Sequence, residues 1–164
     1  MTDAIKVAVR VRPLSKQERE NGHSFAWNVQ ANCISPVDSR DSRYTLDHVF
    51  GPNWTTHRIY EATTQPLLHK VISGFNSTVF AYGQTSSGKT YTMRGTPEDA
   101  GLIPLAVNEI FALIESCQDR EFLLRVSYME LYNEEVHDLL APKQMKLPIH
   151  ESRENGVYVC GLRE

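Results

Sequence analysis

The sequence lacks the features of secreted, membrane-spanning and nucleic-acid-binding chains. It has only three cysteines and no Cys-x-x-Cys pair, so we expect neither a disulfide framework nor a zinc site, and a reducing, intracellular compartment. No run of about 18 apolar residues occurs, and no basic stretch precedes an apolar run at the N-terminus, so we expect no membrane span and no signal peptide. The formal charge is -3 at pH 7. Because Lys and Arg form no cluster, we expect no nucleic-acid partner.

The composition is that of one soluble globular domain, or of part of one. The 164 residues are 41% hydrophobic and 23% charged, which suits a folded chain better than a disordered or fibrous one. The histidines lack the spacing that places two imidazoles on one face of a helix. We therefore interpret all six as ordinary surface or core residues: His23, His48, His57, His69, His137 and His150.

The first part of the chain shows strand and helix signals in turn. Apolar and polar side chains alternate over residues 5–12, which predicts a strand, and the proline that follows closes it. Residues 15–43 favour loops and small strands. Thr55 or Thr56 can cap a short helix, and a second helix has Pro66 in its first turn.

The remainder of the chain predicts further strands around one long helix. Residues 77–82 predict a buried strand that follows the glycine at position 74, where the preceding helix ends. Residues 103–117 have apolar side chains at helical spacing. Residues 121–132 are apolar on both alternating faces, as in a central strand, and residues 157–162 predict a final short strand. This order of elements predicts a layered α/β fold.

One segment predicts a phosphate-binding loop. Residues 83–90 have the sequence GQTSSGKT, which matches GxxxxGK[ST] at every fixed position, between a predicted strand and a predicted helix. Gly83 and Gly88 allow a tight turn whose amide N–H groups point at phosphate oxygens. Lys89 is expected to reach the β and γ phosphates, and Thr90 to offer its hydroxyl to Mg²⁺. The sequence predicts a nucleotide site made of Gly83, Gln84, Thr85, Ser86, Ser87, Gly88, Lys89 and Thr90.

Several segments resemble the kinesin motor domain. The segment that contains the loop is FNSTVFAYGQTSSGKTYTMRG, and it resembles that family almost letter for letter. Three further segments of the chain also resemble this family: VAVRVRP, LDHVFGPNWTTHRIYE and GLIPLAVNEIF. The stretch REFLLRVSYMELYNEEVHDLL looks most like the centromere-protein-E subfamily. The resemblance extends over residues 5–164.

The resemblance implies that residues 1–164 are the N-terminal portion of a motor domain. It implies a P-loop NTPase-type α/β fold, incomplete in these residues, in which helices flank a central mixed β-sheet. It further implies the cofactors ATP and Mg, microtubules (tubulin) as partner in the cytoplasm and cytoskeleton, and a homodimer formed through regions not present here. An adenine site is implied at Arg10, Arg12 and Pro13 on one side and Tyr91 on the other, since a flat base can stack on a ring or a guanidinium plane. Without the loop, Arg10 and Arg12 would be interpreted as a solvated strand face and Tyr91 as a core aromatic.

The chain departs from the family pattern in three ways. Leu105 stands where the family more often has arginine. The γ-phosphate sensors of the family, Ser-Ser-Arg and Asp-Leu-Ala-Gly-Ser-Glu, occur nowhere in the 164 residues, and a loop that only holds phosphate should hydrolyse ATP slowly. In the family's sheet, two strands that come late in the sequence flank the strand before the loop. We therefore expect this part of a motor, from a truncated gene product, to be marginally stable by itself.

Three functions remain open. The whole protein can be a microtubule-stimulated ATPase that moves along the filament, or the chain can be a non-motile module that binds nucleotide or a partner without turnover. An unrelated P-loop ATPase or GTPase is disfavoured by the flanking segments. The dense carboxylate cluster is interpreted as a solvated turn rather than a glycosidase-like acid/base pair; its members are Glu130, Glu134, Glu135 and Asp138.

Overall fold

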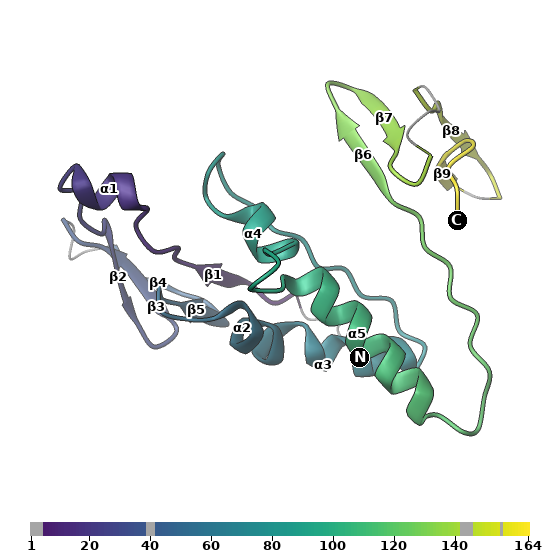
Figure 1. Cartoon of the computed structure of the whole chain (residues 1–164), viewed down its shortest axis with the longest axis horizontal. Coiled ribbons are helices and arrows are strands. Elements are labelled where there is room, and N and C mark those ends of the chain that lie inside the picture. The colour runs from purple at the N-terminus through teal and green to yellow at the C-terminus, as the bar shows by residue number, and fades with distance from the viewer. Residues whose placement is uncertain (1–4, 39–41, 142–145, 155) are drawn as a thin grey trace. The chain divides into compact units, whose positions relative to one another are not determined.

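The computed structural model describes residues 5–38, 42–141, 146–154 and 156–164. The chain forms two compact units, residues 1–118 and residues 119–164, whose elements are drawn in Figure 1. No helix in these described ranges is long and apolar enough to span a membrane. Each unit has its own hydrogen-bonded strands, and the phosphate loop belongs to the first.

The first unit begins with a short parallel strand pair. Strand β1 (Ala8–Arg10) pairs with β5 (His48–Phe50), with Val9 opposite Val49. The strand predicted over residues 5–12 is confirmed, in a shorter form. It places Arg10 at its last position, from which the side chain extends toward the helices of the same unit.

Small elements follow, as the sequence predicts for residues 15–43. Helix α1 (Lys16–Glu20) starts at a Ser15 capping box that the predicted loops did not include. Three antiparallel strands come next, in the order β2-β3-β4. They are β2 (Trp27–Gln30), β3 (Cys33–Pro36) and β4 (Tyr44–Thr45). Residues 39–41 of this region lie outside the described residues.

Helices α2 (Thr56–Thr63) and α3 (Gln65–Ile72) confirm both predicted short helices. The side chain of Thr55 accepts a hydrogen bond from the backbone N–H of Arg58, so Thr55 is the N-cap. Proline occupies the first turn of α3, and Gly74 follows that helix with φ 97°, in the left-handed region that glycine adopts without a steric penalty.

The core of this unit lies where α2, α3 and α5 (Leu102–Ser116) pack together. Figure 1 shows the teal helix α3 beside the green helix α5. Tyr60, Leu68 and Leu102 are buried, and Leu105 packs against them. Leu105 therefore contributes apolar contact area to this core.

The strand predicted over residues 77–82 is wrong for this structure. The chain has no helix or strand over residues 75–83, and the side chains of Phe80 and Tyr82 are 79% and 95% exposed. A buried strand requires hydrogen-bonded neighbours, and none of the described strands lies beside this segment. That both neighbours come from later sequence stays an expectation drawn from the resemblance.

The second unit contains two antiparallel hairpins. Strand β6 (Met129–Tyr132) pairs with β7 (Glu135–Asp138), and β8 (Ile149–Ser152) pairs with β9 (Gly156–Val159). The final strand predicted over residues 157–162 is present in part as β9. The central strand predicted over residues 121–132 is wrong: only β6 forms, and Leu123 is 80% exposed, because no flanking strand or helix covers that run among the residues described.

Candidate functional site

Glycine determines the conformation at both ends of the phosphate loop. Residues 83–88 lead into helix α4 (Lys89–Met93), so the predicted helix start after the loop is confirmed. Gly83 has φ 154° and Gly88 has φ 99°. A Cβ atom on Gly83 would lie 2.6 Å from Oγ of Ser87, closer than real Cβ contacts. An added Cβ would thus require the Ser87 side chain to shift, and the positive φ favours glycine at this position.

The apex of the loop is held by a cation from the N-terminal segment. Ser86 has φ 65°, a left-handed conformation that costs a non-glycine residue about 1 kcal/mol or more. Its carbonyl oxygen accepts a hydrogen bond from Nε of Arg12 at 3.1 Å. Within the loop, the backbone N–H of Ser87 donates to the carbonyl oxygen of Gln84 at 3.2 Å. These bonds hold an unfavourable turn in one shape.

The lysine of the motif lies against the backbone of its own loop. Nζ of Lys89 donates to the carbonyl oxygen of Gly83 at 2.7 Å and to that of Gln84 at 2.9 Å. The ammonium group is thus positioned by neutral acceptors, and it forms no ion pair with a carboxylate of the described residues. Thr90, the second residue of α4, has an exposed side chain. The ammonium group of Lys89 and the hydroxyl group of Thr90 therefore come from consecutive residues at the end of the loop.

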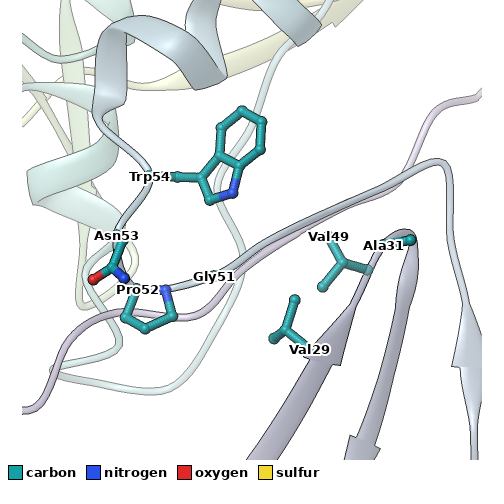
Figure 2. A pocket seen from close by; sticks show the side chains of 7 residues that line it. All are labelled: Val29, Ala31, Val49, Gly51, Pro52, Asn53 and Trp54. Carbon is teal, nitrogen blue, oxygen red and sulfur yellow. The ribbon is translucent and has the colours of Figure 1, made fainter.

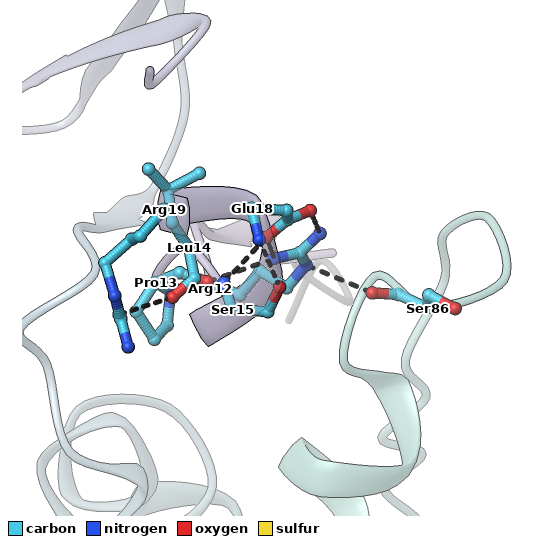
Figure 3. A network of polar contacts seen from close by, with 7 residues as sticks. All are labelled: Arg12, Pro13, Leu14, Ser15, Glu18, Arg19 and Ser86. Carbon is cyan, nitrogen blue, oxygen red and sulfur yellow. Dashed lines mark hydrogen bonds and ion pairs between the residues drawn. The ribbon is translucent and has the colours of Figure 1, made fainter. Parts of the chain in front are cut away.

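Arg12 makes its strongest contacts with Glu18, as Figure 3 shows. Its two terminal nitrogens donate to the two carboxylate oxygens of Glu18 at 2.7 and 2.6 Å, a bidentate geometry. Glu18 also accepts from the backbone N–H of Ser15. The hydrogen bonds from Arg12 lower the pKa of Glu18 from its ordinary value to about 2, and the same contact raises the pKa of Arg12. Arg12 therefore links helix α1 to the apex of the phosphate loop.

Arg10 contacts Tyr91, the third residue of α4. The guanidinium carbon of Arg10 lies 5.1 Å from the centroid of the Tyr91 ring, a cation–π distance. The terminal nitrogens of Arg10 donate to the hydroxyl oxygens of Thr92 at 3.0 Å and Thr56 at 3.1 Å. The Tyr91 hydroxyl donates to the carboxylate of Asp99. Burial lowers the pKa of Arg10, and the bond to Asp99 raises the pKa of Tyr91.

The structure thus divides the predicted base-binding residues into two groups. Arg10 and Tyr91 contact each other, whereas Arg12 donates to Glu18 and to the carbonyl oxygens of Ser86 and Pro13. The sequence interpretation missed Glu18, although the Ser-x-x-Glu capping-box spacing that starts at Ser15 could have indicated it. It also missed Asp99, whose role depends on a tertiary contact that no local pattern reports.

An apolar pocket of about 400 Å³ lies elsewhere in the first unit, and Figure 2 shows its lining. None of its lining residues belongs to the phosphate loop, and none is ionisable. At its edge, the guanidinium carbon of Arg58 lies 4.6 Å from the centroid of the Trp54 ring, a cation–π distance. The lining residues are Val29, Ala31, Val49, Gly51, Pro52, Asn53 and Trp54. This pocket offers no acid, base or charge for chemistry.

The carboxylates of the second unit have structural partners. Asp138 is 1% exposed and accepts from the backbone N–H groups of Leu140 and Arg163. Glu135 forms an ion pair with Lys146. Glu130 lies on β6, opposite His137 across the hairpin. Glu130 and Glu134 are exposed, as a solvated turn requires, but the solvated-turn interpretation is wrong for the buried Asp138. Because Asp138 binds backbone amides and Glu135 binds a cation, the geometry does not favour an acid/base pair.

Comparison with known proteins identifies the family. The family model of the kinesin motor domain matches residues 10–164 of this chain. The chain belongs to the kinesin family. It is 52% identical over 162 residues to kinesin-like protein KIN-7I of Oryza sativa subsp. japonica, covering 99% of this chain and 13% of that protein. It is 50% identical over 167 residues to kinesin-like protein KIN-7N of Arabidopsis thaliana, covering 99% of this chain and 20% of that protein.

The kinesin fold is also found among solved structures. A fast kinesin, solved for its ATPase mechanism and its interactions with microtubules, superposes with a TM-score of 0.89 at 41% identity, over 97% of this chain and 47% of that one. The predicted P-loop-type mixed α/β fold is therefore confirmed, in partial form. The plant relatives are kinesin-7 proteins, the centromere-protein-E-like subfamily, so the subfamily resemblance is confirmed too.

The comparisons support general properties of the kinesin family. Kinesins are microtubule motors that bind ATP with magnesium. This chain spans less than a quarter of the length of the two plant relatives. The chain is also similar to relatives whose names include the words mitochondrial or chloroplastic. Membership of the family therefore indicates only a general association with the cytoskeleton.

Proposed function

We propose that residues 1–164 form the N-terminal portion of a kinesin motor domain and bind Mg-ATP at residues 83–90. The observation that supports this most is the pair of bonds from Nζ of Lys89 to the carbonyl oxygens of Gly83 and Gln84. These bonds hold the ammonium group at the loop before any ligand binds, so little reorganisation is needed when phosphate arrives. Carbonyl oxygens are weaker partners for an ammonium group than phosphate oxygens are.

The residues of the loop fit a triphosphate with magnesium. The turns at Gly83 and Gly88 have positive φ values, as expected of a backbone cradle that closes around phosphate oxygens. Backbone N–H groups and Lys89 would hold the phosphates, and the Thr90 hydroxyl would be a ligand of the magnesium ion. When bound, that ion neutralises charge that develops on the phosphate oxygens.

The base is proposed to stack beside Tyr91. This side chain is 42% exposed although Arg10 lies over its ring, so part of the aromatic surface remains accessible to a flat ligand. Pro13, three residues after the end of β1, is included in the base site from the resemblance alone. Arg12 contributes through the loop apex, because it donates to the carbonyl oxygen of Ser86.

The whole motor is proposed to couple ATP hydrolysis to movement along microtubules. Its partner is tubulin, its location is the cytoplasm and the cytoskeleton, and its homodimer forms through segments other than these 164 residues. The Ser-Ser-Arg and Asp-Leu-Ala-Gly-Ser-Glu segments are absent from residues 1–164. We therefore propose that residues 1–164 alone bind ATP and hydrolyse it slowly. Phosphoryl transfer depends on positioned water and charge stabilisation, which such strings supply.

Nucleotide competition tests this function. The purified chain should bind a fluorescent ATP analogue in the presence of Mg²⁺, and unlabelled ATP should displace it at lower concentration than GTP does. Chelation of Mg²⁺ should weaken binding, and added microtubules should stimulate turnover little. A preference for GTP would contradict ATP as the ligand of this site, and stimulated turnover equal to that of a full motor would contradict slow hydrolysis.

A further inference from the structure

We propose that Asp99 is a positioning residue that fixes the Tyr91 ring for base stacking, an inference that rests on the proposed nucleotide site. Nothing in the motif assigns Asp99 a role. It lies beyond the end of α4 in the loop that leads to α5, nine residues after the end of the phosphate loop.

Four side chains form a closed network at this place. Arg10 donates to the Thr56 hydroxyl at 3.1 Å, and that hydroxyl donates to Asp99 at 3.3 Å. Tyr91 donates to the same carboxylate oxygen of Asp99, and the guanidinium group of Arg10 lies over the Tyr91 ring. Thr56 is 0% exposed, so one corner of the network is anchored in the interior.

The ring needs such support because α4 is short. The helix has five residues and no side-chain N-cap, and so short a helix is held by tertiary contacts rather than by its own hydrogen bonds. Tyr91 directly follows Thr90, the proposed magnesium ligand. The direction of the ring relative to the phosphate loop is therefore determined by tertiary contacts, among them the hydrogen bond to Asp99 and the guanidinium group of Arg10.

The loop that carries Asp99 is itself closely packed. The backbone of Asp99 exchanges hydrogen bonds with Thr96: its carbonyl oxygen accepts from the Thr96 N–H at 2.9 Å, and its N–H donates to the Thr96 hydroxyl at 3.1 Å. Gly95 pairs with Ala100 in an antiparallel bridge. The loop uses the backbone of Asp99 for its own turn, which leaves the carboxylate for Tyr91 and Thr56. An alanine at position 99 would keep that turn.

The test compares two ligands that share phosphates and differ in the base. Calorimetric titration of the 164-residue chain uses Mg-ATP and Mg-tripolyphosphate, with the variants Asp99→Ala, Tyr91→Phe and the double variant. Loss of a hydrogen bond to a charged group should weaken ATP binding about tenfold in each single variant. Tripolyphosphate binding should stay unchanged. The double variant should be no weaker than either single variant, because both remove one interaction. Glu98→Ala, an exposed carboxylate in the same loop, should change neither ligand.

The other outcomes overturn the proposal in distinguishable ways. If the variants bound ATP and tripolyphosphate equally more weakly, Asp99 would support the fold and would have no role in base positioning. If both single variants bound ATP as the wild type does, Asp99 would have no role in nucleotide binding. If the wild-type chain bound ATP no more tightly than tripolyphosphate, base stacking at Tyr91 would be ruled out, and phosphate binding by the loop would still be supported. If the wild-type chain bound neither ligand, the proposed function and this inference would both fail.

Discussion

Nζ of Lys89 donates a 2.7 Å hydrogen bond to the carbonyl oxygen of Gly83, joining the last part of the phosphate loop to its first residue. The bond closes the loop around its own backbone without help from a carboxylate. A cation held in this way keeps its charge available to a phosphate. The loop is therefore organised for an anion before one binds.

The first prediction concerns the tight turn at Gly83. Gly83→Ala places a methyl group 2.6 Å from Oγ of Ser87 at a φ of 154°, so we expect a loss of stability of about 1–3 kcal/mol and weaker ATP binding. Gly22→Ala is the matched control, since its φ is also positive but no atom lies within 4 Å of the added methyl. Chemical denaturation and nucleotide titration measure both effects. Equal losses in the two variants would show that crowding at Gly83 has no consequence.

The second prediction concerns acid stability and Glu18. Arg12 lowers the pKa of Glu18 to about 2, so Glu18 contributes stability above its ordinary pKa. That contribution is lost as the pH falls through the window from about 4.5 to about 2, because the unfolded carboxyl takes up a proton first. Glu18→Gln should flatten the fall in melting temperature within that window.

Glu20→Gln serves as the control for this measurement. Glu20 lies in the same helix and meets Lys16 in an exposed i,i+4 pair at 3.8 Å, which is worth little in water. Its removal should leave the pH profile of the wild-type chain intact. A Glu18→Gln profile that superposes on the wild-type profile would contradict the Arg12–Glu18 link.

The third prediction concerns a buried hydroxyl. Tyr60 is in the core, and its hydroxyl has no hydrogen-bond partner among the described residues. Burial, with a smaller effect of Glu109, raises its pKa to about 12. Tyr60→Phe removes the unsatisfied group and should raise the free energy of unfolding by about 1 kcal/mol. Tyr158→Phe, on strand β9 with an exposed ring, should change it by less than about 0.5 kcal/mol. A destabilised Tyr60→Phe variant would reveal a partner for the hydroxyl.

The fourth prediction concerns the exposed apolar segments. Because residues 77–82 and 121–128 are not covered by other elements, we expect the isolated chain to be marginally stable in urea. Leu123→Ser should leave its unfolding unchanged, since the side chain is 80% exposed, whereas Leu68→Ser in the core should destabilise it by about 2 kcal/mol or more. A single cooperative wild-type transition of several kcal/mol would contradict marginal stability.

Local signals predicted the elements that depend on local physics. The Thr55 cap, the proline in α3 and the glycine at position 74 fix helix ends through backbone groups within a few residues, and all three have their predicted roles. Strands depend on partners far away in sequence. The apolar runs at residues 77–82 and 121–132 have strand composition, but composition does not supply the neighbours that bury a strand.

The candidate site was predictable to a similar extent. The glycines and Lys89 follow from the motif, because backbone conformation and charge at fixed spacing define it. The hydrogen-bond partners of Arg12 and Tyr91 did not follow from the motif. Arg12 binds Glu18, and Tyr91 binds Asp99. The capping-box spacing at Ser15 marks Glu18 but not its pairing with Arg12, and the contact between Tyr91 and Asp99 is produced by folding of the loop between α4 and α5.

The central claim is that Lys89 holds the phosphates of ATP. Calorimetric titration of the chain with Mg-ATP should give saturable binding to one site, and Lys89→Ala should abolish tight binding because the phosphates lose their charge partner. Lys70→Ala, an exposed lysine in α3, should bind as the wild type does. Unchanged affinity in Lys89→Ala would contradict the account of the loop.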